Sequence, residues 1–184
     1  MLSSYLENPT NCFFEGQDHD ENILLLLRAH PVTNLSWIIP SLLLFLLPYF
    51  WPFIVEMLNI QFPPIPQNLV NVLILVNYLI VLVVTFEGFL HWYFNVYILT
   101  NKKIVDIDFH SLMFKNVDLA PLSQIQEANS QMAGLLGIIF HYGDVFIQTA
   151  GAKVAIDFHQ VPNPHKVADK IMDEVLRVGG KGAG

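Results

Sequence analysis

One stretch of the sequence limits what the rest of the chain can fold into: residues 69–90 read LVNVLILVNYLIVLVVTFEGFL. Residues 69–86 carry no charged side chain, and a helix needs about 20 predominantly apolar residues to cross a bilayer. A core helix of a soluble protein would be shorter and would show a polar face. We therefore predict a membrane span, within which a partner helix or an interfacial position accommodates Asn71 and Asn77. Glu87 stands at its end, where a charge costs less than at the bilayer centre.

A second apolar run covers residues 35–55 and contains three prolines. Membrane helices tolerate proline better than soluble helices, because neighbouring groups satisfy the freed carbonyls. We therefore predict a second span, a kinked helix that has Thr33 or Asn34 as its N-cap and that frays near residues 48–52. Aromatic side chains stand at both ends, and Trp37 is predicted to lie at one membrane interface.

The connection between the two apolar runs, residues 56–67, is short and contains no Lys or Arg. Residues 35–90 are therefore predicted to form a two-span antiparallel hairpin. The nearest basic residues, which include Arg28, Lys102 and Lys103, all lie on the other side of this hairpin. The positive-inside rule then predicts that both termini are cytoplasmic and that the connection is outside.

Composition argues against several classes of function. The 184 residues carry a formal net charge of −7, whereas nucleic-acid binding needs a basic face and an electrostatic membrane anchor needs a polybasic segment. Cys12 is the only cysteine, so neither a disulfide framework nor a thiolate metal site can be built. The apolar excess is concentrated in the two predicted spans.

The part that precedes the first apolar run divides in two. Residues 1–22 contain five acidic residues and no Lys or Arg, and we expect a mobile acidic tail. Residues 23–34 follow as a pre-membrane segment, whose apolar start at residues 23–27 is too short to span a bilayer. These five residues form either a strand that docks on the soluble domain or an interfacial segment, and we favour the strand.

After the second span the hydrophobic period changes from helical to the alternation typical of strands. Residues 91–178 are predicted to form a soluble domain of strands, with a short helical turn at residues 134–140. Gly143 is expected to restart the strands with positive φ. Asn163 and Pro164 begin an amphipathic helix that packs on the sheet, and residues 179–184 are expected to form a flexible tail. The predicted strands are residues 93–99, 103–109, 117–119, 125–132, 144–149 and 154–158.

Several antiparallel strands followed by one helix is the order of elements in a pleckstrin-homology (PH) fold. Four segments, YILTNKKIVDID, VDLAPLSQIQ, GLLGIIFHYGDVFIQTAG and FHQVPNP, resemble the successive signature segments of the bacterial membrane-anchored PH-like family. The resemblance covers about residues 92–176, with Lys103 where an arginine is more usual. It implies an α+β fold with membrane helices: a transmembrane hairpin in the bacterial inner membrane, then a PH-like antiparallel β-sandwich or barrel capped by a C-terminal α-helix.

We find no pattern that predicts catalysis. The seven histidines lack the helical or clustered spacing of a zinc site. Asp106 and Asp108 share one face of a predicted strand, but without a third polar partner we interpret them as a solvated face and not as an acid–base pair. The spans contain no central ionisable cluster, which a membrane-embedded enzyme would need. We therefore expect no enzyme activity, no cofactor and no metal.

The direction of the first strands predicts where the domain meets lipid. A strand that rises about 3.3 Å per residue from Trp92 carries Lys102 and Lys103 up to about 30 Å away, too far to reach the head groups of the same membrane. The second strand returns, so the turn after it should rest on the head-group boundary or on residues 23–27; the alternative is that it packs into the domain's own core. The predicted membrane-interface residues are Leu112, Met113, Phe114, Lys115, Trp37 and Trp92.

These observations favour a tethered protein-binding or assembly module. Its predicted partner is another membrane protein or a second copy of the chain, beside the lipid bilayer, and not nucleic acid. The alternative is a lipid-responsive or lipid-handling membrane component that acts at the head-group interface. The side chains of the last helix that are predicted to face a partner are Lys166, Lys170, Asp173 and Glu174.

Overall fold

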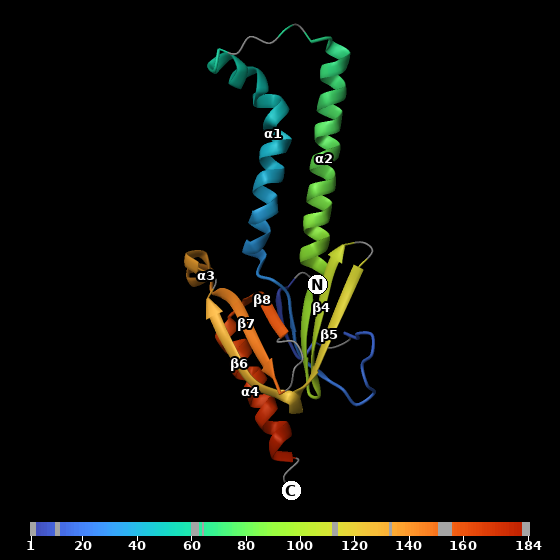
Figure 1. The fold of residues 1–184 in the computed structure, drawn as a ribbon, viewed down its shortest axis with the longest axis vertical. Helices are drawn as coiled ribbons and strands as arrows, with labels where there is room; N and C mark the ends of the chain where they lie inside the picture. The colour runs from blue at the N-terminus through green and yellow to red at the C-terminus, as the bar shows by residue number, and fades with distance from the viewer. Residues whose placement is uncertain are drawn as a thin grey trace. The chain divides into compact units, whose positions relative to one another are not determined.

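The computed structural model describes residues 3–9, 12–59, 63, 65–111, 114–132, 134–150 and 156–181. The chain divides into two compact units. Residues 34–90 form a helical unit, and residues 1–33 together with residues 91–184 form a second unit, which we call the β domain (Figure 1). The β domain is therefore built from segments on both sides of the helical unit in the sequence.

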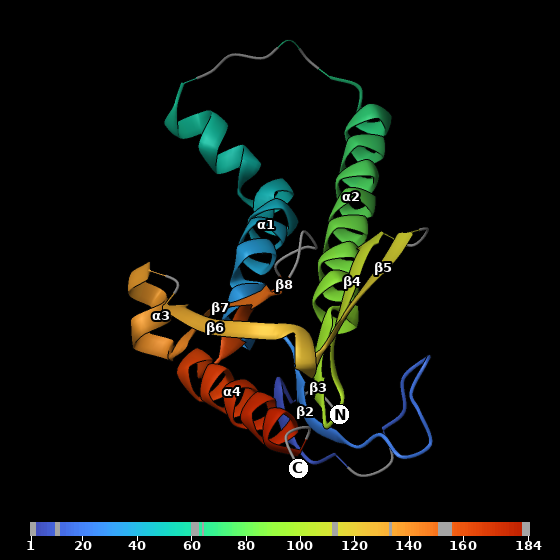
Figure 2. The same ribbon diagram turned by 60° about the horizontal axis from the view of Figure 1, so that its bottom comes forward.

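The helical unit consists of α1 (Leu35–Met57) and α2 (Gln67–Phe94), the last turn of which belongs to the β domain. α1 continues through its three prolines to Met57, so the predicted fraying near residues 48–52 is wrong. The predicted kink is present, because Figure 2 shows the axis of α1 changing direction, as prolines cause. Asn34 is the N-cap, but its side chain makes no cap hydrogen bond and instead accepts one from Trp37 Nε1 at 3.1 Å.

Two contacts fit α1 and α2 together. Asn77 Nδ2 donates a hydrogen bond to the carbonyl oxygen of Leu44 at 3.0 Å, so this asparagine has the partner helix that the sequence predicts. Gly88 leaves room for the indole of Trp37, whose ring carbons a Cβ at this position would approach to 2.6 Å. A side chain at residue 88 would therefore push the helices apart.

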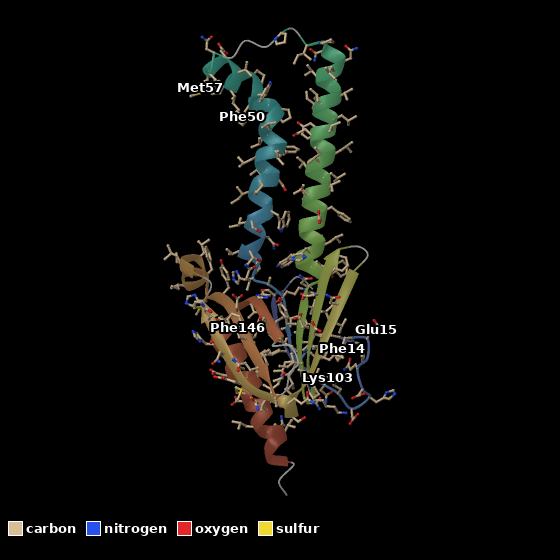
Figure 3. All side chains as sticks on the ribbon, viewed as in Figure 1. Phe14, Glu15, Phe50, Met57, Lys103 and Phe146 are labelled. Atoms are coloured by element: carbon tan, nitrogen blue, oxygen red, sulfur yellow. The ribbon has the colours of Figure 1, made fainter. Side chains whose placement is uncertain are left out.

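Within the described residues, two helical segments are long and apolar enough to cross a membrane: Pro31–Met57, with 27 residues, and Gln67–Phe94, with 28 residues. Only 6% of the most apolar stretch of each is buried inside the structure. Their apolar side chains are mostly exposed, as Figure 3 shows for Phe50 and Met57. The core helix of a soluble protein would instead be mostly buried.

The described part of the β domain contains two antiparallel sheets. The five-stranded sheet has the order β1-β2-β3-β4-β5, the three-stranded sheet has the order β6-β7-β8, and α4 contacts β6 and β7. The strands are β1 (Tyr5–Glu7), β2 (Ile23–Leu27), β3 (Val96–Thr100), β4 (Lys103–Ser111), β5 (Phe114–Pro121), β6 (Ile125–Met132), β7 (Tyr142–Thr149) and β8 (Ile156–Pro162). The helices are η1 (Pro31–Asn34), η2 (Leu122–Gln124), α3 (Gly134–Phe140) and α4 (Pro164–Lys181).

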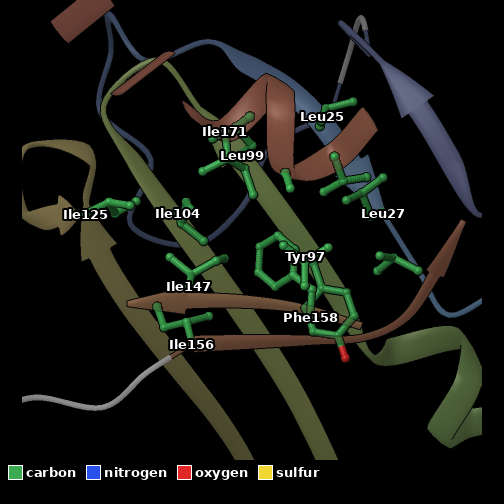
Figure 4. Close-up of a cluster of buried hydrophobic side chains, with 14 of the residues drawn as sticks. Leu25, Leu27, Tyr97, Leu99, Ile104, Ile125, Ile147, Ile156, Phe158 and Ile171 are labelled. Carbon is green, nitrogen blue, oxygen red and sulfur yellow. The ribbon is translucent and has the colours of Figure 1, made fainter. Parts of the chain in front are cut away.

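The core forms where alternation along the strands turns apolar side chains of the two sheets toward each other (Figure 4). Tyr97 on β3 and Phe158 on β8 stack with 4.6 Å between ring centroids, so the two sheets meet at this pair. α4 closes the core with Val167 and Ile171, which are fully buried. The apolar face that the 3.6-residue period predicts for this helix is confirmed at these two positions, but Leu176, which the period assigns to the same face, is 69% exposed.

The N-terminal segment is more ordered than its charge predicts. β1 pairs with β2, so that Leu6 lies opposite Leu26, and Glu21 is only 3% exposed. The expectation of an acidic tail over residues 1–22 is therefore wrong for these parts, because β2 offers a free edge with which a short strand can pair. β2 itself lies between β1 and β3, which confirms the predicted strand at residues 23–27.

Several predicted boundaries are also wrong. Residues 93–94 continue α2, so β3 begins at Val96. β5 is longer than the predicted residues 117–119, β7 begins earlier and β8 ends later, while residues 154–155 lie outside the described residues. α4 continues into the predicted tail as far as Lys181. Cross-strand pairing, which the local pattern does not show, extends the strands beyond their apolar centres.

The backbone conformation of the turn between α3 and β7 differs from the predicted one. α3 occupies the expected residues, but Gly143 does not have a positive φ, and His141 has one of 57° instead. Gly143 is required for another reason: a Cβ there would collide with the carbonyl oxygen of Gln131 on β6. The glycine therefore allows close approach of two strands.

Candidate functional site

Residues 28–29, just before the helical unit, contact residues 92–93, just after it. Arg28 Nε donates a hydrogen bond to the carbonyl oxygen of Tyr93 at 3.0 Å, and the guanidinium lies 4.9 Å from the centroid of the Tyr93 ring. The indole Nε1 of Trp92 donates to the carbonyl oxygen of Ala29 at 2.8 Å. Trp92, a predicted interface residue, therefore lies beside the start of the apolar segment at Pro31.

The β4–β5 hairpin returns to the same end of the domain. The N–H of Phe109 donates to Asn95 Oδ1 at 2.6 Å, and the carbonyl oxygen of Phe109 lies 3.1 Å from His91 Nδ1. The rings of Phe109 and Phe94 have their centroids 5.2 Å apart. The second strand of the predicted pair thus comes back to the end of α2, as its direction predicts.

The residues predicted to touch lipid in this hairpin are only partly described. Leu112 and Met113 lie outside the described residues. Phe114 and Lys115 belong to β5, but their side chains lie outside the described part as well. Their contact with head groups stays a prediction.

Acidic residues of the N-terminal segment cover the turn between β3 and β4. Lys103 Nζ lies 3.1 Å from Glu21 Oε2, and Glu21 Oε1 accepts a hydrogen bond from Thr100 Oγ1 at 2.6 Å. Lys102 Nζ lies 3.0 Å from a carboxylate oxygen of Asp20, and this hydrogen bond lowers the pKa of Asp20. Carboxylates of the same chain therefore neutralise the two lysines, which leaves this turn a poor site for an anionic ligand.

Asp106 is an unusual carboxyl group of the domain. It lies on β4, opposite Tyr97 of β3 and Asp118 of β5, and it is 7% exposed. One of its carboxylate oxygens is buried with no hydrogen-bond partner among the described residues. Burial raises the pKa of Asp106 to about 7, helped by the charges of Asp108, Asp118 and Asp157. The predicted solvated face is therefore wrong for Asp106, because this residue lies on the same face of β4 as the core residue Ile104.

The polar face of α4 is partly used within the domain. Lys170 Nζ pairs with a carboxylate oxygen of Glu7 on β1 at 3.2 Å. Glu174 pairs with Arg177 of the same helix at 3.3 Å. Lys166 and Asp173 are exposed. Of the four predicted partner-facing residues, the structure thus presents these last two most openly.

The histidines and carboxylates do not assemble a metal centre in the described part of the chain, where no group of three or more His, Cys, Asp or Glu side chains is placed to hold an ion. His165 Nδ1 lies 2.6 Å from Ser130 Oγ, and His159 Nδ1 lies 3.6 Å from a carboxylate oxygen of Asp144. These pairs join neighbouring elements of the fold. We assign structural roles to both pairs.

Sequence reasoning missed one surface, which belongs to α3. Leu135, Leu136, Ile138, Ile139 and Phe140 are all exposed, although each is large and apolar. The signal was present in the letters GLLGIIF, which we interpreted only as a helical turn. A short apolar helix has the same sequence pattern whether it is exposed or buried, so the pattern alone could not predict the exposure of α3.

Comparison with protein families identifies the architecture. A model of the family described as "Bacterial PH domain" matches residues 26–175, a range that includes both apolar helices. The chain belongs to this family. A search of solved structures finds the crystal structure of a DUF1696 family protein with a pleckstrin-homology domain from Shewanella loihica PV-4. It is 15% identical, with a TM-score of 0.35, and the alignment covers 44% of this chain and 70% of that chain. No match is found among curated proteins.

The range that matches the bacterial PH family thus encloses the helical unit. The family match begins within β2 at residue 26 and ends within α4 at residue 175, and the helical unit lies between β2 and β3 in the sequence. The resemblance to bacterial PH-like proteins is confirmed, as is an α+β fold with antiparallel sheets and a C-terminal helix. β2, which precedes the helical unit in the sequence, pairs with β3, which follows it.

Proposed function

We propose that this protein is a membrane-anchored bacterial PH domain that works as a tethered protein-binding or assembly module. The observation that carries the proposal is the exposure of two helical segments of 27 and 28 residues whose surfaces are almost entirely apolar. Water would disfavour so large an apolar surface, and the hydrocarbon core of a bilayer would favour it. On this proposal both termini and the PH domain lie in the cytoplasm, at the bacterial inner membrane.

The paired ends of the helical unit support the hairpin form of this anchor. Arg28 contacts Tyr93, and Ala29 accepts a hydrogen bond from Trp92, so the first apolar segment starts where the second ends. A hairpin returns the chain to the side from which it came, and these two contacts support that arrangement. Tethering to a membrane raises the effective concentration of the PH domain for neighbouring membrane proteins.

The binding surface that we propose is the exposed part of α4 and the edges of the sheets. Lys166 and Asp173 are exposed, whereas Lys170 and Glu174 pair within the domain. The best position for a photo-reactive residue is therefore Asp173. We propose no enzymatic activity and no nucleic-acid partner for this surface.

Cross-linking in native membranes tests the module. A photo-reactive amino acid replaces Asp173, and the control replaces Gln148, an exposed residue of β7. We expect a discrete protein adduct from position 173, either to a second copy or to another membrane protein, and none of the same mass from position 148. Equal, diffuse labelling at both positions would argue against a dedicated surface on α4.

A second function, lipid sensing or lipid handling, is favoured by one observation. Phe109 near the end of β4 packs against Phe94 at the end of α2, so the β4–β5 hairpin lies where the helix leaves the proposed bilayer. The readout is lipid that copurifies with the detergent-extracted full chain. Enrichment of one lipid class that persists at high salt would favour this function, and the bulk membrane composition would argue against it.

A further inference from the structure

The β6–β7 connection carries an apolar surface that the fold of the domain does not use. α3 projects from the ends of β6 and β7, as Figures 1 and 2 show. Five of its seven residues are large and apolar, and their exposed fractions run from 44% for Phe140 to 75% for Leu135. This is a cluster of side chains and not an isolated exposed residue.

The sequence around α3 lacks the polar character of an ordinary surface connection. Residues 128–143 contain no Asp, Glu, Lys or Arg, although Glu127 and Asp144 flank them directly. Four or more exposed apolar residues in a short run are unexpected on a soluble domain unless they bind something. The composition therefore indicates an apolar partner.

The position of α3 identifies that partner. The ring centroid of Phe140 lies 6.5 Å from that of His30, and Tyr142 stacks on the same imidazole at 5.5 Å. His30 is held in place because its N–H donates to the carbonyl oxygen of Gln160 at 2.7 Å. Pro31, the next residue, begins the first apolar segment. If that segment spans a bilayer, His30 lies at the bilayer surface by covalent connection, and α3 beside it lies at the same level.

The distribution of side chains around α3 suits lipid better than a protein groove. At 100° per residue, the five apolar side chains cover an arc of about 200°. Gly134 and Gly137 fall on the remaining side, and Gly137 is buried. A helix that docks into a protein groove needs only a stripe about 100° wide, with polar residues beside it. The wide uncharged arc of α3 fits immersion at the boundary between head groups and acyl chains.

We propose that α3 inserts into the bilayer surface as a third membrane contact, with lipid acyl chains as its ligand. The inference rests on the proposed anchoring of the protein through its helical unit. Two helices alone leave the PH domain free to tilt about its attachment. A further contact with the bilayer, through Leu135, Leu136 and Ile139 of the β6–β7 connection, would limit this tilt. It would thereby fix which faces of the domain point toward the cytoplasm.

Depth-dependent quenching of a fluorophore tests the insertion in the full chain. The background variant is Cys12→Ser, and an environment-sensitive dye is attached at Leu135→Cys. The matched control is Leu176→Cys on α4, because Leu176 is a helical leucine with a similar exposed fraction, 69% against 75%. A third position, Leu79→Cys in the middle of α2, reports on the anchor itself. The protein is reconstituted into phosphatidylethanolamine–phosphatidylglycerol vesicles that contain lipids with nitroxide-labelled acyl chains.

We expect nitroxide lipids to quench the dye at positions 135 and 79 at least twofold and aqueous iodide to quench only the dye at position 176. Iodide quenching at position 135 equal to that at position 176, with position 79 still quenched by lipid, would overturn the α3 contact and leave the anchor intact. Protection of position 135 from both quenchers would overturn the lipid contact of α3 and would indicate that a protein covers this helix. Absence of lipid quenching at position 79 would overturn the anchor and, with it, this inference. Unchanged thermal unfolding of the Leu135→Cys variant in micelles shows that the domain remains folded.

Discussion

The carboxyl group of Asp106 couples the stability of the PH domain to pH. Burial raises its pKa from 3.8 to about 7, so the native state binds a proton more tightly than the unfolded chain between these values. The free energy of unfolding therefore falls as pH rises from about 4 to about 7, and this group adds no further change outside that window. We expect a loss of about 2–4 kcal/mol across it. Denaturant-dependent hydrogen exchange of core amides, in detergent-solubilised full chain at pH 4 and pH 8, measures this loss.

The control for this prediction is substitution of the same group. Asp106→Asn removes the ionisation and should flatten the pH dependence while stabilising the domain at pH 8. Asp108→Asn, two residues along β4, removes only a neighbouring charge and should preserve most of the slope. A slope that survives in Asp106→Asn would show that other groups cause it.

Glu21 is expected to stabilise the PH domain, because it is 3% exposed and its carboxylate lies 3.1 Å from Lys103 Nζ. Glu21→Ala would remove the carboxylate that pairs with Lys103, leaving its Nζ only the carbonyl oxygen of Gly16, and would remove one of the two acceptors of Thr100 Oγ1. We expect a loss of about 2–3 kcal/mol, less than for a fully buried pair because the lysine side chain is 19% exposed. Asp18→Asn, at the rim of the same turn, should change stability by less than about 1 kcal/mol. Similar melting temperatures for both variants in micelles would contradict the difference in burial.

Among the elements, α4 offers a matched comparison between its two faces. Ile171 is fully buried in the core, whereas Leu176, five residues later, is 69% exposed. Ile171→Ala should cost about 3 kcal/mol, because it leaves a cavity between α4 and the sheets. Leu176→Ala should stay within about 0.5 kcal/mol of the parent protein. Thermal unfolding of the two variants in the same detergent measures both, and equal losses would mean that α4 does not pack as described.

Elements with a strong period of their own were predictable from the sequence. The long uncharged runs of α1 and α2, and the amphipathic spacing of α4, each identify a helix by local pattern alone. β1 was missed because three residues carry no periodic signal, and only the open edge of β2 gives them a partner. Gly143 was misinterpreted because its role depends on the backbone of β6, which is distant in the sequence.

The candidate site was less predictable than the fold, for the same reason. The return of the β4–β5 hairpin to the end of α2 could be predicted, since strand direction and length fix it. The neutralisation of Lys103 by Glu21 could not, because it needs the fold of a segment that looks disordered by composition. The burial of Asp106 and the exposure of α3 are both properties of tertiary structure, and alternation or helical spacing does not encode them.

The whole chain distributes its charges unevenly, and this predicts its orientation. Between Arg28 and Glu87 the only charged residue is Glu56, so every Lys and Arg lies in the PH domain and its flanking segments. The positive-inside rule then places the connection between α1 and α2 on the far side of the membrane from the PH domain. Cysteine accessibility in spheroplasts measures this, with Gln67→Cys at the start of α2 and Asp173→Cys on α4, both in the Cys12→Ser background.

A membrane-impermeant maleimide should label Gln67→Cys in intact spheroplasts and Asp173→Cys only after permeabilisation. The reversed pattern would keep the hairpin and invert the orientation, which would mean that so few basic residues do not determine it. Labelling of both positions in intact cells would place α4 and the connection on one side and contradict a two-span hairpin. The expected pattern holds only if α1 and α2 each cross the bilayer once, so this measurement tests the anchor on which the position of the PH domain depends.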